Sequence, residues 1–372
     1  MNPLVENTDS PPIPLVQAWG RTYRQAAGPM IDLCQAVPGY SPHEGFLGRM
    51  AAAAADPLNA KYGFIVGDTA LREAYAVETG TSVDRVLITA GCNQAFFAAL
   101  LTLVPRGAAV LLPTPWYYNH KMTCDMLGLE ARALPTTPAT GFIPDPDEAA
   151  ALMDGVAAVV LITPNNPTGA IYPSTTIERF AELCRVRGAT LLLDETYRDF
   201  QSSSAIQPSD DIVRLYSFSK SYAVPGHRIG ALTLPSHLVP QAVKVLDCLH
   251  ICPQRPAQVA LAWAVDGLRE WREANRQEML YRALAMRHAF ATIPDWQIDS
   301  LGAYFAYVRH PFRGTSAWKV TEQLAREYGV LLLPAPAFAG SPDHVRVSFA
   351  NVNSSGIELL AQRLAAVRHP SP

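Results

Sequence analysis

The chain has 372 residues, enough for about two domains, and 49% of them are hydrophobic, so a large core can form. Its formal net charge of -3 and the lack of a lysine and arginine cluster give no reason to expect nucleic acid or an anionic membrane as a partner. No apolar run is long enough to span a bilayer, and the N-terminal residues lack the pattern of a signal peptide. Six cysteines without metal-site spacing predict reduced thiols, no metal site and a cytoplasmic location.

A polar beginning precedes a repeated pattern of strand, loop and helix. Residues 1 to about 15 are rich in proline, and we expect an extended arm there. Helices are predicted at 50–55 and 71–77, and again between the later strands at 94–103 and 177–187. Near-continuous apolar runs predict buried strands at 86–89, 109–112, 157–162, 190–193, 212–216 and 229–234. Such strands, separated by helices, indicate a parallel sheet that is covered on both faces.

The pattern changes after about residue 239. Helical patterns dominate to about residue 291. A smaller α/β unit follows, with strands at 304–308, 330–333 and 344–349 and a last helix at 357–369. We therefore predict an α/β protein whose large domain, 45–265, contains a mostly parallel sheet covered by helices. The smaller α/β domain would combine both chain ends, 1–44 with its N-terminal arm and 266–372.

A lysine stands directly after one of the predicted strands. Lys220 lies among Ser217, Ser219 and Ser221, and Arg228 follows across a Pro-Gly turn. An open α/β sheet binds its ligands at the carboxyl ends of its strands. There, a desolvated lysine amine can form a Schiff base with an aldehyde, while Ser217 and Arg228 suit one phosphate group. An aldehyde and a phosphate on one small molecule indicate pyridoxal phosphate; the alternative is a surface turn with a solvated lysine.

Other strand and helix ends carry side chains that suit the same cofactor. Asp194 ends an apolar strand, where its carboxylate could hold the protonated pyridine nitrogen or, alternatively, cap a helix. Tyr197 and Asn166 could bind the phenolate oxygen of the ring, although Asn-Pro is also common in turns. Residues 90–93 open a helix and offer backbone N–H groups to a phosphate. Tyr117 could stack on the ring or simply belong to the core.

Together these motifs resemble the pyridoxal-phosphate-dependent aminotransferases of fold type I, the class I/II family, from about residue 33 to 349. Asn-Asn-Pro-Thr-Gly, Asp-x-x-Tyr, Ser-Phe-Ser-Lys and Pro-Gly-His-Arg-Ile-Gly stand in the family's order and spacing at 165–169, 194–197, 217–220 and 225–230. The resemblance implies an enzyme that moves an amino group between an L-amino acid and a 2-oxo acid. It would work by a ping-pong mechanism through a Lys220 Schiff base.

The resemblance also implies a role for each matching residue. Lys220 would move the substrate α-proton, and Arg346 would bind the α-carboxylate, near Asn166 and near Ala36, where the family usually has glycine. Asp194 and Tyr197 would complete the catalytic set with Lys220. The implied cofactor contacts are Lys220, Asp194, Tyr197, Asn166, Ser217, Arg228, Cys92, Asn93, Tyr117 and Tyr62. His120 would orient Asp194, and Tyr62 would reach the phosphate in the neighbouring subunit of a homodimer.

Several alternatives share some of these features. A β-lyase, a decarboxylase or a cyclase of secondary metabolism would keep every cofactor contact. A cofactor-sensing transcription regulator would need a DNA-binding domain before residue 33, and a nucleotide-binding protein would need a G-x-G-x-x-G motif, so we favour neither. Arg255 could face the site and select an acidic or polar substrate, or it could be a solvated loop residue. The aromatic residues that hint at an apolar or aromatic substrate side chain are Phe64, Trp116, Tyr117 and Tyr118.

Overall fold

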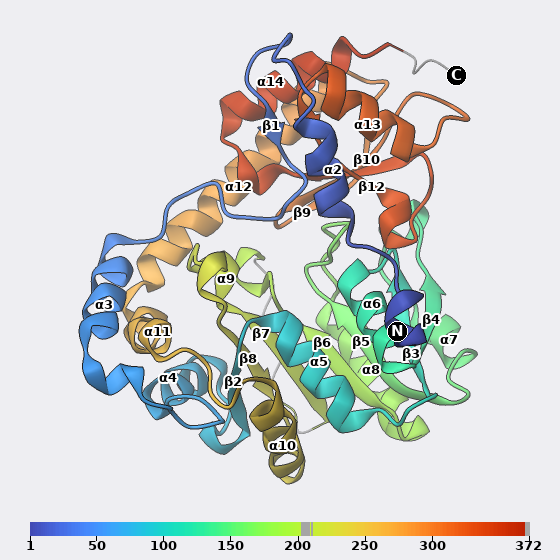
Figure 1. Ribbon diagram of the computed structural model, residues 1–372. Coiled ribbons are helices and arrows are strands. Elements are labelled where there is room, and N and C mark those ends of the chain that lie inside the picture. Colours follow the sequence, from blue (N-terminus) through green and yellow to red (C-terminus); the bar gives the residue numbers. More distant parts are fainter. Residues whose placement is uncertain (202–208, 210, 369–372) are drawn as a thin grey trace.

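A seven-stranded sheet forms the centre of the larger part of the computed structural model, which describes residues 1–201, 209 and 211–368 (Figure 1). The strands run in the order β2-β8-β7-β6-β5-β3-β4. From β7 to β4 all neighbours are parallel, whereas β8 is antiparallel to both β2 and β7. The bounds are β2 Val86–Thr89, β3 Ala109–Thr114, β4 Glu130–Pro135, β5 Val156–Ile162, β6 Thr190–Asp194, β7 Ile212–Ser217 and β8 Gly230–Thr233.

Helices cover both faces of this sheet. They are α3 Glu44–Ala55, α4 Thr69–Thr79, α5 Cys92–Leu103, α6 Tyr118–Leu127, α7 Pro146–Ala150, α8 Ser174–Arg187, α9 Phe218–Ser221, α10 Val239–His250 and α11 Arg255–Gly267. Because successive strand residues point to opposite faces, Leu192 packs in one core cluster with Phe96 of α5. Leu191 and Leu193 pack in another with Phe180 of α8. This two-sided burial explains why the central strands are continuously apolar.

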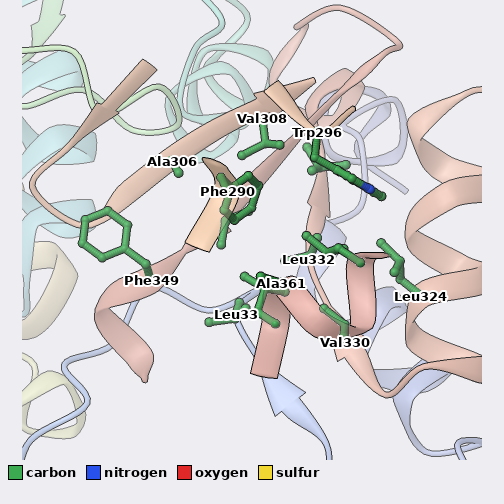
Figure 2. Close-up of a cluster of buried hydrophobic side chains, with 14 of the residues drawn as sticks. Leu33, Phe290, Trp296, Ala306, Val308, Leu324, Val330, Leu332, Phe349 and Ala361 are labelled. Carbon is green, nitrogen blue, oxygen red and sulfur yellow. The ribbon is translucent and has the colours of Figure 1, made fainter. Parts of the chain in front are cut away.

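The smaller part combines both ends of the chain. Its four-stranded antiparallel sheet has the order β12-β13-β10-β9, and the short β1 pairs in parallel with β11. Figure 2 shows Leu33 close to Ala361 of α14 within one buried cluster. The Leu33 N–H also donates to the carbonyl of Leu331 in β11 at 2.9 Å. The bounds are β1 Ile31–Asp32, α12 Arg269–Ala291, β9 Gln297–Gly302, β10 Phe305–Arg309, α13 Ala317–Glu327, β11 Val330–Leu331, β12 Leu333–Pro334, β13 His344–Ser348 and α14 Ser354–Ala365.

The structure confirms the α/β class and corrects several local predictions. The N-terminal arm is not extended: it contains α1 Pro3–Glu6 and α2 Pro12–Gly20, because proline is well suited to the first turn of a helix. The predicted strand 330–333 is divided between β11 and β12, which belong to two sheets. The last helix ends at Ala365, and residue 369 lies outside the described part of the chain.

Besides the two-residue β1, the sequence does not predict the strands β4 and β9. Both lie at the edge of a sheet and are largely polar or partly exposed, so they lack the apolar run by which the other strands were recognised. Among the helices of the described residues, none combines the length and the hydropathy that a membrane span requires.

Candidate active site

A cavity of about 400 Å³ opens where β5, β6 and β7 end. Ile162, Asp194 and Ser217, the last residues of these three strands, all line it. The smaller part of the molecule closes the other side with residues from the loop after β1 and from β13. The predicted site residues that line this one cavity are Ala36, Cys92, Asn93, Tyr117, Asn166, Asp194, Tyr197, Ser217, Lys220, Arg228 and Arg346.

Lys220 lies in the one-turn helix α9, directly after β7. The helix begins because Ser217 caps it, with its hydroxyl accepting a hydrogen bond from the N–H of Ser219 at 3.3 Å. The Lys220 amine donates to the backbone carbonyl of Ala36. Burial, followed by repulsion from Arg346 and Arg228, lowers the pKa of this amine to about 8. A lysine in this state has a reactive neutral fraction close to physiological pH.

The first turn of α5 and the Arg228 guanidinium form a positive cradle beside Lys220. Among the described residues, no side chain caps the start of α5, so its first backbone N–H groups are available to an anion. Gly91, at φ 86°, lets the guanidinium approach, since a Cβ there would clash with Nη2 of Arg228. Nη1 of Arg228 donates to the Pro225 carbonyl at 3.0 Å. The Ser219 hydroxyl, which also lines the cavity, is buried without a hydrogen-bond partner among the described residues.

Asp194 is held in place by three donors. His120 Nε2 lies 3.3 Å from Oδ2, while Oδ1 accepts from the Thr196 N–H at 2.9 Å and faces the Cys92 Sγ at 3.6 Å. Phe96 stacks on the His120 ring with 3.9 Å between centroids. Burial alone would raise the pKa of Asp194, but the hydrogen bonds and charge from His120 and the bonds from Thr196 outweigh it, so this pKa is lowered. The carboxylate therefore stays ionised and can hold a cation.

Two aromatic residues and an amide lie between these groups. Tyr117 is fixed by the Asn119 side-chain amide, which donates to its hydroxyl at 2.9 Å. Tyr197 is buried and contacts the Phe305 ring edge-on, with centroids 5.1 Å apart. Burial raises the pKa of the Tyr197 hydroxyl well above its ordinary value, so it remains a hydrogen-bond donor. Asn166 is buried at the same place and accepts from Arg346.

Arg346 is almost fully buried, with 1% of its surface exposed. Nη1 donates to Oδ1 of Asn166 at 2.9 Å, and Nη2 donates to the Cys34 carbonyl. Phe305 and Phe338 flank the guanidinium carbon, with ring centroids at 4.9 and 5.1 Å. The Nε–H group has no partner within the described chain. A buried arginine that neutral groups hold in this way suits an incoming carboxylate.

Some of the residues considered in the sequence lie outside the cavity. Tyr62 is 79% exposed, and Phe64 is 66% exposed. Arg255, the first residue of α11, forms an ion pair with Asp68 at 3.3 Å and donates to the Leu58 carbonyl at 2.7 Å, so within the chain it is neither solvated nor part of the cavity. His120 lies behind Asp194, as the resemblance implies.

Other residues of the cavity were not given a role from the sequence. Ser217, Ser219 and Ser221 are all buried, but of the three only the Ser219 hydroxyl lacks a partner among the described residues, which the sequence does not reveal. Thr196 contributes through its backbone, for which no sequence signal exists. The remaining residues of this kind come from segments far apart in the chain and are Ile13, Gln35, Val37, Asn119, Ile162 and Pro225.

The chemistry of these groups fits pyridoxal phosphate. The cradle at α5 with Arg228 and the orphaned Ser219 hydroxyl suit its phosphate, and the ionised Asp194 suits its pyridine nitrogen. Residues 28–364 match the family model described as aminotransferase class I and II. The chain belongs to this family. It is a pyridoxal-phosphate-dependent aminotransferase.

Several named relatives of this aminotransferase are similar along most of their length. An aromatic aminotransferase of Arabidopsis thaliana is 27% identical over 91% of this chain and 88% of its own. A valine–pyruvate aminotransferase of Mycobacterium tuberculosis is 28% identical over 96% of both chains. An arginine–pyruvate transaminase of Pseudomonas aeruginosa is 30% identical over 79% of this chain and 80% of its own. The structure of aspartate aminotransferase from Thermus thermophilus with maleate, 23% identical, has the same fold, with a TM-score of 0.91 over 98% of this chain and 99% of that one.

Proposed function

We propose that this aminotransferase moves the amino group of an L-amino acid to a 2-oxo acid in two half-reactions, and that Lys220 is its catalytic base. The observation that carries the proposal is the position of Lys220. Its amine, whose pKa is lowered to about 8, lines one cavity together with the ionised Asp194 and with Arg346, which is held by neutral groups. These are the groups that a proton transfer next to a carboxylate requires.

When bound, pyridoxal phosphate supplies an aldehyde that condenses with amines and a ring that accepts electrons. The α5 N-terminus, Arg228, Ser217 and Ser219 would hold its phosphate. Asp194 would keep the pyridine nitrogen protonated. Asn166 and Tyr197 would hold the ring oxygen, and Tyr117 would pack against the ring.

The chain's own residues then position the substrate and move its proton. Arg346 binds the α-carboxylate, which fixes the α-carbon relative to Lys220. The neutral Lys220 amine takes the proton from the α-carbon of the substrate. The same lysine then gives up a proton, which completes the transfer of the amino group. Because Arg346 holds the carboxylate by charged hydrogen bonds, loss of carbon dioxide is disfavoured relative to loss of the proton.

We also propose that the working enzyme is a homodimer in which Tyr62 reaches the phosphate in the neighbouring subunit. In support, three large apolar side chains in one short segment are strongly exposed in the single chain, namely Leu58, Tyr62 and Phe64. The proposed domain division is 45–265 against 1–44 plus 266–372. It is supported by the seven-stranded sheet, which lies within 86–233, and by the pairing of β1 with β11. A cytoplasmic location stays a prediction.

The test is the absorption spectrum of the purified holoenzyme during titration with single amino acids and then with 2-oxo acids. We expect a yellow band that an amino acid bleaches and an oxo acid restores. Bleaching that no oxo acid reverses, with release of pyruvate, ammonia or carbon dioxide, would instead indicate a β-lyase, decarboxylase or cyclase. A protein that takes up no cofactor would contradict the whole assignment.

A further inference from the structure

We propose that Tyr40 and Tyr304 are positioning residues for the reaction, because their hydroxyls hold the backbone of Lys220 at the place from which its amine reaches the substrate α-carbon. This inference rests on the proposed function, in which Lys220 moves the α-proton. It adds two residues that do not belong to the described lining of the cavity.

The two tyrosines meet at the backbone carbonyl of Lys220. The Tyr40 hydroxyl donates to this carbonyl at 3.3 Å, and the Tyr304 hydroxyl donates to it at 3.4 Å. The N–H of Ala223 donates to the same carbonyl at 3.2 Å and closes the turn that contains the lysine. Because these bonds are long, we expect a modest contribution from each hydroxyl and a larger one from the pair.

Both hydroxyls are protonated donors on fixed rings. Burial raises the pKa of Tyr40 to about 12 and the pKa of Tyr304 well above its ordinary value, so both keep their protons near neutral pH. Tyr304 packs edge-on against Phe200, with ring centroids 4.7 Å apart. Tyr40 packs edge-on against Trp271, with centroids 5.7 Å apart. The two side chains are thus rigid supports for the carbonyl that they contact.

Tyr40 and Tyr304 come from the two segments that also hold Arg346. Tyr40 lies in the connection after β1, in which the Cys34 carbonyl accepts from Nη2 of Arg346. Tyr304 directly precedes Phe305, whose ring centroid lies 4.9 Å from the guanidinium carbon of Arg346. The same two segments therefore fix both the proposed carboxylate site and the backbone of the catalytic lysine. The proton transfer depends on the relative position of these two groups.

The experiment removes only the hydroxyls, in Tyr40→Phe, Tyr304→Phe and the double variant. Tyr222→Phe is the matched control, because the Tyr222 hydroxyl is also buried and stands two residues after Lys220 but has no hydrogen-bond partner among the described residues. The measured quantity is the rate at which an amino acid bleaches the cofactor band of the holoenzyme. The probes are leucine, phenylalanine, aspartate and arginine, with hydrogen or deuterium on the α-carbon, and the fastest with the wild type is used.

We expect the double variant to lower the bleaching rate at saturating amino acid by about 10-fold or more and each single variant to lower it less. The half-saturating concentration should change by less than about 2-fold, because Arg346 is retained, and the deuterium isotope effect should persist or rise, because proton transfer is the slowed step. An undiminished rate in the double variant, a change confined to the half-saturating concentration, an equal fall in Tyr222→Phe, or a fall with loss of the isotope effect would overturn the inference. Failure of all four amino acids to bleach the wild-type band would instead contradict the proposed function.

Hydrogen exchange of the resting holoenzyme tests the positioning without any reaction. The Ala223 N–H shares the Lys220 carbonyl with the two hydroxyls, so its exchange rate reports how firmly this turn is held. We expect exchange at Ala223 to be about 5-fold faster in the double variant and unchanged in Tyr222→Phe. Equal exchange in the wild type and the double variant would show that the hydroxyls do not hold Lys220.

Discussion

Nε2 of His120 lies 3.3 Å from Oδ2 of Asp194, and both side chains are almost completely buried. The other oxygen of Asp194 is held by the Thr196 N–H and the Cys92 thiol. The carboxylate is thus oriented from two sides before any ligand arrives. The His120 ring is itself fixed by stacking on Phe96.

Removal of the His120 hydrogen bond should weaken cofactor binding. A hydrogen bond to a charged group contributes roughly 1.5–3 kcal/mol, so we expect His120→Leu to raise the Kd for pyridoxal phosphate by about 10-fold to 100-fold. Fluorescence titration of the apoenzyme measures this constant. His237→Leu, at an exposed position, is the control. Equal Kd values for wild type and His120→Leu would show that His120 does not support Asp194.

The lowered pKa of Lys220 should appear in the stability of the apoenzyme. The folded protein holds this pKa at about 8, while the ordinary value is 10.5, so between these pH values the unfolded chain binds more protons. The free energy of unfolding should therefore rise with pH in this window, by up to about 1.4 kcal/mol per pH unit from this one group. The Lys220→Met variant lacks the amine. Denaturant unfolding of wild type and variant from pH 8 to 10.5 therefore isolates the contribution of this amine to the pH dependence of stability. Parallel pH profiles would mean that the pKa is not lowered.

Gly91 should be essential for the phosphate cradle. Gly91→Ala combines a backbone conformation that favours glycine, with φ 86° and ψ 168°, with a clash against Arg228. We expect a loss of about 1–3 kcal/mol in stability and a lower affinity for inorganic phosphate and cofactor. Gly188→Ala is the control, since Gly188 also has a positive φ, 69°, but its Cβ would meet open space. Similar phosphate affinity in the two variants would show that Gly91 does not contribute to phosphate binding.

The sequence predicted most of the site because of where its residues stand along the chain. Asp194, Ser217 and Lys220 follow apolar strands, and parallel neighbours bring their carboxyl ends to one edge of the sheet. Ile13 carried no such signal, because its place in the cavity depends on how α2 packs on the smaller part. The edge strands were missed for a related reason: one-sided, polar strands lack the pattern of a buried strand.

A partly buried ion network behind the Lys220 helix should contribute to stability. Glu78 of α4 accepts from Arg272 of α12 at 3.1 Å and from Arg198 at 3.3 Å. Glu78→Ala leaves the two guanidinium groups only longer contacts, Arg198 with Glu195 at 3.7 Å and both arginines with Asp199 at 3.8 Å. We therefore expect a loss of roughly 1–3 kcal/mol in the free energy of unfolding. Denaturant titration measures this free energy of unfolding. Glu182→Ala, which breaks an exposed pair with Arg185, should have little effect.

The same network reaches the catalytic lysine through one tyrosine. The Tyr216 hydroxyl donates to Oδ2 of Asp199 at 2.5 Å and lies 2.8 Å from the hydroxyl of Ser221, the residue after Lys220. Equal losses of stability in Glu78→Ala and Glu182→Ala would contradict a stabilising role for this partly buried network.

The central claim is that Lys220 carries the cofactor, and reduction of the holoenzyme with borohydride tests it most directly. The reduced protein is digested, and mass spectrometry locates the pyridoxyl group. We expect one group per chain, on the peptide that contains Lys220, and none in the Lys220→Met variant. Attachment to another lysine, such as Lys121, or the absence of any attachment in a protein that binds the cofactor, would contradict the account.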